Sequence, residues 1–158
     1  MKKTNITYTR LLLMGALSFI SMYVLMYMMA NKYDNVYPNL NQFYMAGMMT
    51  APMLFIELLL MGSMYPNKIV NIFFMVISVF LLILFIFFLR EQTAISDKEF
   101  LKSMIPHHAG AILMCEKSSL KDTEIRKLCQ SIISSQQSEI DWMKQKLNSI
   151  AGDKDTNS

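Results

Sequence analysis

The chain has 158 residues, of which 53% are hydrophobic and 17% charged, and its formal net charge at pH 7 is +3. The apolar residues gather in long blocks, a pattern that excludes an ordinary soluble domain and is typical of membrane spans. The whole charge excess precedes Arg90, and the balanced remainder forms no basic stripe for a phosphate backbone, so we set nucleic-acid binding aside.

Three long apolar runs predict three transmembrane helices, since about 20 residues at roughly 1.5 Å per residue cross a hydrocarbon core. The basic residues Lys2, Lys3 and Arg10 before the first run also resemble the start of a signal peptide. The run is long and no clear small-x-small cleavage site follows it, so we favour a retained anchor. We place the spans near residues 11–30, 43–64 and 69–89, within a membrane domain covering residues 1–92.

The second run contains a proline and an acid. Pro52 removes a backbone donor and should kink the helix, while neighbouring helices can satisfy the carbonyl that it frees. Glu57 has two interpretations: a functional intramembrane carboxylate, or a protonated acid that is hydrogen-bonded between helices or lies nearer the interface. The polar loop before this run, residues 31–42, carries Tyr33 and Tyr37, which suit an interfacial position.

Methionine is unusually frequent in the apolar part of the chain. Twelve of the 16 methionines lie between residues 14 and 75, some of them at helical spacing. A thioether track that leads an ion toward the histidines is one interpretation. We favour lipid-facing or helix-packing side chains, because methionine is a common gap-filler.

The distribution of positive charge favours one orientation in the membrane. Lys68 and the basic residues at the amino terminus would share the cytoplasmic side, with Lys32 and Arg90 on the other. Three spans place the two chain ends on opposite sides. We therefore expect a multi-pass protein of the cytoplasmic (inner) membrane, with the tail from Arg90 on the periplasmic or extracellular side.

The remainder of the chain predicts two amphipathic helices joined by a turn. Ser96 with Glu99 forms a capping box that starts the first helix, and Asp122 is the predicted N-cap of the second. Together they make an antiparallel hairpin over residues 96–150, and the polar tail 151–158 should fray. The expected inner face of the first helix comprises Phe100, Met104, His108, Ala111 and Cys115.

Both histidines of the chain lie side by side in the segment MIPHHAGAILMC. A thioether cannot be protonated at working pH and imidazole is a borderline ligand, so a methionine and histidine set selects Cu(I) over Mg²⁺ or Ca²⁺. Pro106 should interrupt the helix before the histidines, and the second helix can bring further donors to face them. The predicted metal ligands are His107, His108, Met104, Met114, Met143, Glu139 and Cys115.

Packing is the competing interpretation of these side chains. Adjacent histidines can buttress a helix start, methionines can fill core space, and Gln136 can fix the register of the hairpin. The methionines alone favour packing, whereas the joint set with His107 and His108 favours a metal. Cys115 and Cys129 either add thiolates or form a disulfide across the hairpin in an oxidising compartment, and the sequence leaves both open.

The blocks FLKSMIPHHAGAILM and LCQSIISSQQSEIDWMKQKL resemble the bacterial family of the domain of unknown function DUF305, over residues 96–147. The resemblance implies a ferritin-like architecture of two-helix repeats, usually outside the cytoplasm, and a metal role with copper as the leading candidate. Many members carry an acid where this chain has Leu113, a departure that weakens the case for a hard metal. The matching positions are Met104, His107, His108, Gly110, Met114, Gln137, Glu139 and Met143.

The expected fold class is all-α, with three transmembrane helices followed by a two-helix antiparallel hairpin of ferritin-like type. The expected function is soft-metal handling, of copper or silver, by a protein anchored in the lipid bilayer. The alternative is a structural or regulatory membrane subunit without metal, whose hairpin self-associates into a four-helix bundle; a homo-oligomer is expected in either case. We do not expect an enzyme, because di-iron chemistry needs Glu-x-x-His pairs and neither histidine has a glutamate three residues before it.

Overall fold

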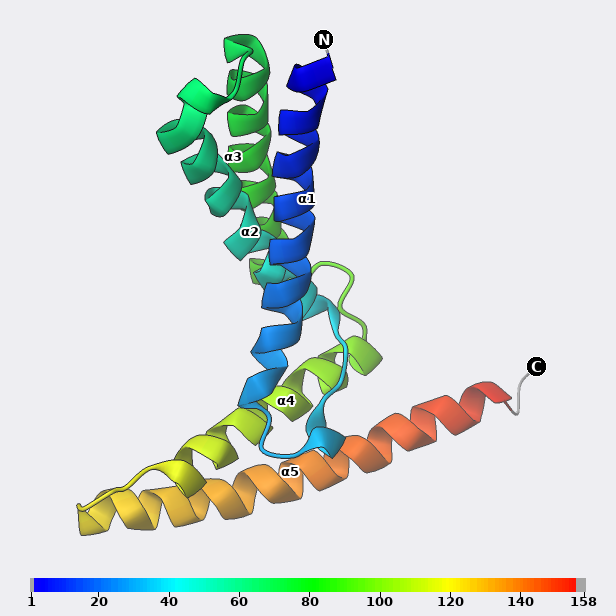
Figure 1. Cartoon of the computed structure of the whole chain (residues 1–158). Helices are drawn as coiled ribbons and strands as arrows, with labels where there is room; N and C mark the ends of the chain where they lie inside the picture. Colours follow the sequence, from blue (N-terminus) through cyan, green and yellow to red (C-terminus); the bar gives the residue numbers. More distant parts are fainter. Residues whose placement is uncertain (1, 156–158) are drawn as a thin grey trace. The chain divides into compact units, whose positions relative to one another are not determined.

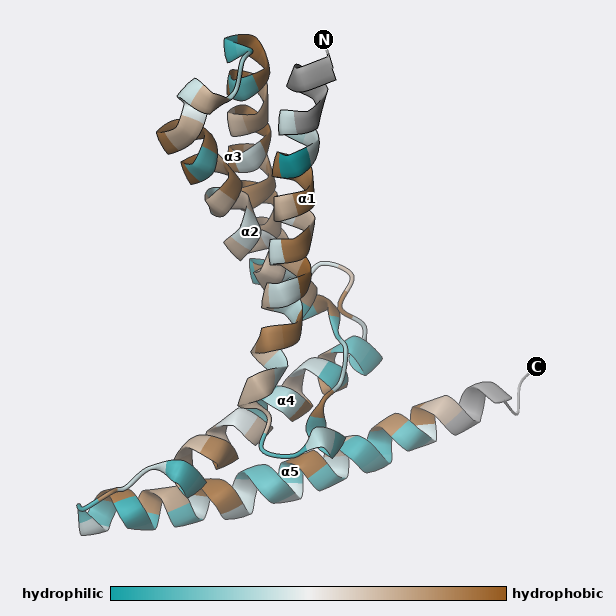
Figure 2. Ribbon diagram, viewed as in Figure 1, coloured by the Kyte–Doolittle hydropathy of each residue, from teal (hydrophilic) through white to brown (hydrophobic). Residues whose placement is uncertain are grey.

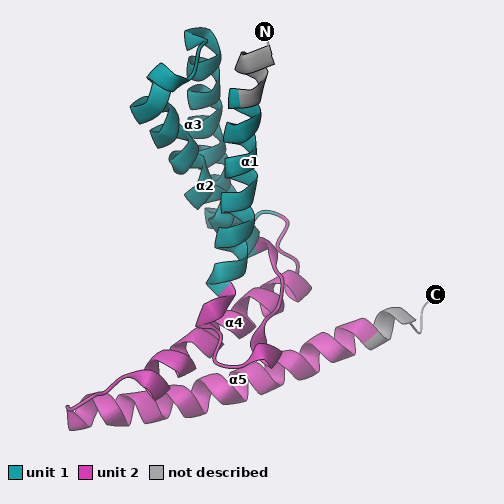
Figure 3. Ribbon diagram, viewed as in Figure 1, with its two compact units in different colours: residues 1–26, 41–93 teal, residues 27–40, 94–158 magenta. Residues whose placement is uncertain are grey.

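The structure is a computed structural model that describes residues 2–155, with side chains described from Thr7 to Ala151. All regular structure within these residues is helical, and they contain no strand. The chain divides into two compact units, coloured separately in Figure 3. Unit 1 comprises residues 1–26 and 41–93, and unit 2 comprises residues 27–40 and 94–158. The all-α prediction is confirmed.

Unit 1 is built mainly from α1 (Lys2–Leu25), α2 (Leu40–Met61) and α3 (Lys68–Arg90), drawn from blue to green in Figure 1. Short 3₁₀ turns extend the carboxyl ends of the first two helices. Three segments are long and apolar enough to cross a membrane, and Figure 2 colours the ribbon by the hydropathy of their residues. They run over Thr7–Met29, Leu40–Met64 and Lys68–Arg90, each within a few residues of a predicted span.

Small residues let the helices of unit 1 approach closely. A Cβ atom added at Gly47 of α2 would lie 2.5 Å from the Phe85 ring of α3, so only glycine fits there without a shift of that ring. Gly15 of α1 lies similarly against Leu54 of α2, with 3.1 Å between the built Cβ and a methyl carbon. Close backbone approach at small residues increases the van der Waals contact between neighbouring helices, and it is also common where helices cross a membrane.

A polar cluster joins the helix ends around the α2–α3 turn. The Tyr8 hydroxyl donates to Asn71 Oδ1 (2.6 Å), and the Asn67 side chain caps α3 by accepting from the amides of Ile69 and Val70. The Tyr65 hydroxyl donates to Glu57 Oε1 at 3.1 Å. Burial, with a further contribution from Glu57, raises the pKa of Tyr65 to about 12. Tyr65 therefore remains a neutral hydrogen-bond donor to the carboxyl group at any physiological pH.

Unit 2 is the helical hairpin of α4 (Asp97–Lys117) and α5 (Thr123–Asp155). Both predicted N-caps are confirmed: Ser96 Oγ accepts from the Glu99 amide, and Asp122 Oδ1 accepts from the amides of Glu124 and Ile125. The predicted capping box is only half formed, because the Glu99 carboxylate accepts from Leu40 and Lys102 instead. Helix α5 continues past the expected end at Ile150, and the last three residues of the predicted frayed tail lie outside the described residues. The hairpin core consists of Leu101, Ile105, Ala109, Ile112, Ile140, Met143 and Leu147.

Two local expectations for α4 were wrong. The helix does not break at Pro106, which is buried inside an uninterrupted α-helix. Packing of the following turn against α5 outweighs the backbone hydrogen bond that proline removes. The inner face is also displaced by one position from the predicted one, because Leu101 and Ile105 are buried whereas Phe100 is half exposed.

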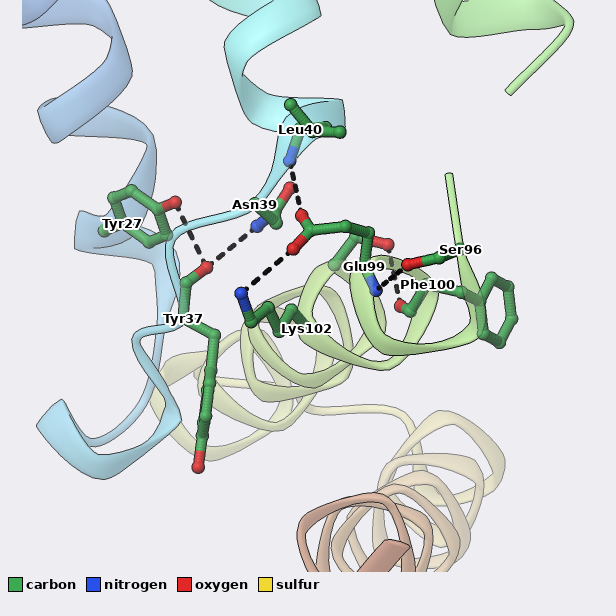
Figure 4. A network of polar contacts seen from close by, with 9 residues as sticks. Tyr27, Tyr37, Asn39, Leu40, Ser96, Glu99, Phe100 and Lys102 are labelled. Carbon is green, nitrogen blue, oxygen red and sulfur yellow. Dashed lines mark hydrogen bonds and ion pairs between the residues drawn. The ribbon is translucent and has the colours of Figure 1, made fainter. Parts of the chain in front are cut away.

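The loop between α1 and α2 belongs to unit 2, where it is tied to the start of α4 (Figure 4). Glu99 is the centre of this connection: one carboxylate oxygen accepts from the Leu40 amide at 3.1 Å, and the other accepts from Lys102 Nζ at 2.9 Å. Tyr37 contributes its carbonyl, which accepts from the Tyr27 hydroxyl and from Asn39 Nδ2. The polar loop that the sequence predicts as a simple connection is thus part of the hairpin unit.

Candidate functional site

His108 lies on the inner face of α4. The buried core residues Ile105 and Ile112 lie about one helical turn before it and after it. Its side chain is 10% exposed, and both ring nitrogens have partners. Nδ1 lies 2.9 Å from the Met104 carbonyl oxygen, and Nε2 lies 2.7 Å from Glu139 Oε2 of α5. The ring is therefore held by its own helix on one side and by the facing helix on the other.

The partners of His108 determine where its protons lie. A carbonyl oxygen can only accept, so Nδ1 carries a hydrogen and donates it to Met104. One further proton then lies between Nε2 and Glu139 Oε2. If Nε2 holds it, an imidazolium donates to a carboxylate; if Glu139 holds it, a neutral carboxylic acid donates to a neutral imidazole. The Glu139 side chain is 54% exposed, so this side of the ring is the one that a solute can reach.

His107 is not part of this pair. It lies on the exposed side of α4, with its ring centre 6.0 Å from that of His108 and the two ring planes at 62°. Successive residues on a helix point about 100° apart, so two adjacent histidines cannot both face α5. The predicted ligand Met114 is likewise exposed, at 55%.

The remaining predicted ligands divide between the core and a disulfide. Met143 is buried in the hairpin core, and Met104 packs against the same cluster, one turn from His108. Cys115 is bonded to Cys129 in a disulfide across the hairpin, with 5.2 Å between the Cα atoms. As a disulfide sulfur, Cys115 offers no thiolate to a metal. Gln137, matched by resemblance, donates to Asp141 on the exposed side of α5.

The charged and histidine side chains by themselves do not form a metal site. Within the described residues, no three His, Cys, Asp or Glu side chains come together in a way that could hold an ion. The structure brings His108 and Glu139 into direct contact, and Met104 and Met143 belong to the hydrophobic core of the same hairpin. That set has one imidazole, one carboxylate and two sulfur donors, a composition suited to a soft ion and unsuited to Mg²⁺ or Ca²⁺.

Sequence reasoning missed the role of Gly110 and the α1–α2 loop at this hairpin. A Cβ built at Gly110 would lie 3.5 Å from the Met29 carbonyl oxygen, so the loop backbone passes directly over α4 there. Gly110 is one of the positions matched by family resemblance, and the signal for a close backbone approach was the glycine itself, inside a helical pattern that otherwise disfavours it.

Comparison with known proteins finds a matching family model and a similar protein. The model of the family described as a domain of unknown function (DUF305) matches residues 89–147. An uncharacterized protein of Acanthamoeba polyphaga mimivirus is 35% identical over 136 residues, which cover 84% of this chain and 88% of that protein. An alignment of that length includes much of unit 1 as well as the hairpin. No solved structure matches the chain.

Proposed function

We propose that this chain, a member of the DUF305 family, is a membrane-anchored protein whose hairpin binds a soft cation, Cu(I) or Ag(I), beside His108. The observation that carries the proposal is the orientation of the imidazole. Its Nδ1–H donates to a backbone carbonyl, which leaves Nε2 directed at Glu139 on the accessible side. Metal-binding histidines are commonly oriented by such a second hydrogen bond.

The donors that accompany His108 support a soft ion. Glu139 is exposed enough to move by the small distance that an ion between it and Nε2 would require. Met104 and Met143 lie in the core of the same hairpin, and thioethers supplied by them would favour Cu(I) or Ag(I) over hard ions. The role that follows is buffering or presentation of the ion, without a catalytic step.

We propose that α1, α2 and α3 cross the cytoplasmic membrane and that the hairpin lies on its outer side. The length and hydropathy of the three segments support the crossing. The excess of basic residues near the amino terminus and at Lys68 supports an inside amino terminus. The Cys115–Cys129 disulfide supports the outer side for the hairpin, because such bonds persist in oxidising compartments.

A second function, without metal, is favoured by one specific observation. The hairpin leaves several large apolar side chains exposed, and two helices alone bury little apolar area. A second copy of the chain would cover them and complete a four-helix, ferritin-like bundle, so that the protein would act as a structural membrane subunit. The exposed side chains are Phe100, Met114, Ile125, Leu128 and Trp142.

A competition titration separates the two functions. The full chain in detergent is titrated with Cu(I) against a chromogenic chelator, alongside His108→Ala and, as a matched control, His107→Ala. The proposal predicts that His108→Ala weakens Cu(I) binding at the hairpin by at least about tenfold, and that the neighbouring change has a much smaller effect. The same affinity and the same number of bound Cu(I) ions in all three proteins would remove the metal proposal for the hairpin and leave the structural subunit.

A further inference from the structure

Helix α2 carries a regular row of sulfur and carboxylate side chains in unit 1. Met49, Met53, Glu57 and Met61 follow one another at intervals of four residues, the spacing at which helical side chains lie one above the next. All four line one open groove of about 360 Å³. This groove lies outside residues 89–147, which the family model matches, and shares no residue with the hairpin site.

Packing can account for the methionines of this row but not for its carboxylate. Leucine would fill the same positions, whereas a carboxylate within a segment as apolar as Leu40–Met64 is costly and by default marks a functional site. Glu57 is the single ionisable side chain among the residues that line the groove. Its contact with the Tyr65 hydroxyl engages one oxygen, Oε1, and a carboxylate has lone pairs on both oxygens for further partners.

The chemistry of the row selects a particular kind of ligand. Thioethers are neutral and polarizable, so they bind soft ions and have little affinity for Na⁺, K⁺ or Mg²⁺. One carboxylate supplies one negative charge, so a monovalent cation bound beside it gives a set with no net charge. That is the state that apolar surroundings tolerate best. Cu(I) and Ag(I) satisfy both conditions.

We propose that Met53, Glu57 and Met61 bind Cu(I) or Ag(I) in the α2 groove. Met53 and Met61 lie one helical turn to either side of Glu57, so their flexible side chains can reach an ion held at its carboxylate. Met49 supplies the next sulfur along the row. Met53 also lines a second groove of about 570 Å³ together with Met14 and Met22 of α1, so the sulfur donors continue onto the neighbouring helix.

The test uses the full chain in lipid nanodiscs, with His108→Ala and Glu139→Ala introduced to remove the hairpin donors. Cu(I) is titrated against a chromogenic chelator. We expect this background to retain one equivalent of bound Cu(I) per chain. Glu57→Gln, and separately the pair Met53→Leu and Met61→Leu, should each weaken its binding by at least about tenfold.

Met48→Leu is the matched control, because it makes the same change on the same helix at a residue that lines neither groove. It should leave the affinity unchanged. A background that holds no Cu(I), or leucine variants that bind as tightly as the background, would overturn the proposal. Methionine-to-leucine changes conserve volume, so the leucine pair decides the question even where Glu57→Gln perturbs folding, as judged by circular dichroism. Neither outcome depends on whether the hairpin site exists.

Discussion

Replacing Cys115 and Cys129 with serine should lower the free energy of unfolding of the hairpin by about 3 kcal/mol. The disulfide joins residues 14 positions apart, across the turn between α4 and α5. Closing a loop of about 15 residues in the unfolded chain removes about 10 cal/mol/K of entropy, which corresponds to about 3 kcal/mol at 25 °C. For a two-helix unit, that is a large part of the net stability available.

Trp142 makes this prediction measurable within a larger membrane protein. It is the single tryptophan of the chain and lies on α5, so its fluorescence reports on unit 2 and not on α1, α2 or α3. Urea unfolding in detergent, followed at this tryptophan, should show the serine variant losing its structure at a clearly lower denaturant concentration than the oxidised protein.

Reduction of the unmodified protein should reproduce the effect of the serine changes, and reductant should not alter the serine variant. Unfolding of the oxidised and serine proteins at the same urea concentration would contradict a stabilising role for the disulfide. Reaction of a thiol-specific label with Cys115 or Cys129, in protein purified without reductant, would contradict the presence of the disulfide.

Three further predictions concern packing and titration. Gly47→Ala should destabilise unit 1 by about 1–3 kcal/mol, because the new methyl group meets the Phe85 ring. Gly62→Ala is the control, since open space surrounds that position, and it should leave the stability of unit 1 unchanged. Thermal unfolding in detergent compares the two variants. Ile140→Ala should cost the hairpin about 2–5 kcal/mol of stability, since Ile140 is fully buried, and Trp142 fluorescence measures the loss. The folded-state pKa of Tyr65 is raised to about 12 from 10.0, so its contribution to stability is complete below pH 10 and is lost as the pH rises through 12. Tyr65→Phe should remove one late-titrating phenol from the ultraviolet absorbance titration.

The sequence predicts those parts of the fold that depend on local patterns. The apolar runs give three segments to within a few residues, because length and hydropathy alone define them. Ser96 and Asp122 mark the helix starts, since a cap is a contact between residues two or three positions apart.

Features that depend on tertiary contacts could not be predicted in this way. A proline in the interior of a helix locally predicts a break at Pro106, yet α4 is continuous there because the surrounding residues pack in the hairpin core. The attachment of the α1–α2 loop to α4 through Glu99 joins residues 59 positions apart, and no periodicity reports such a contact.

In the candidate site, too, local patterns predict some features, and others depend on contacts between the two helices. The predicted stripe on α4 includes His108 and not His107, and the structure pairs His108 alone with Glu139. Sequence reasoning named both residues of this pair and placed His108 on the inner face, but it could not tell that Glu139 of α5 lies opposite His108 until the hairpin register was known. The choice between thiolates and a disulfide at Cys115 and Cys129 likewise required the distance between two helices.

The most direct test of the central claim follows the ring nitrogens of the two histidines by NMR. The full chain contains only His107 and His108, so ¹⁵N-histidine labelling gives a simple spectrum. With saturating Ag(I), the account predicts that His108 Nε2 shifts and couples to silver, that His108 Nδ1 keeps its proton, and that His107 is unchanged. A shift confined to His107, or no shift at either ring, would contradict it.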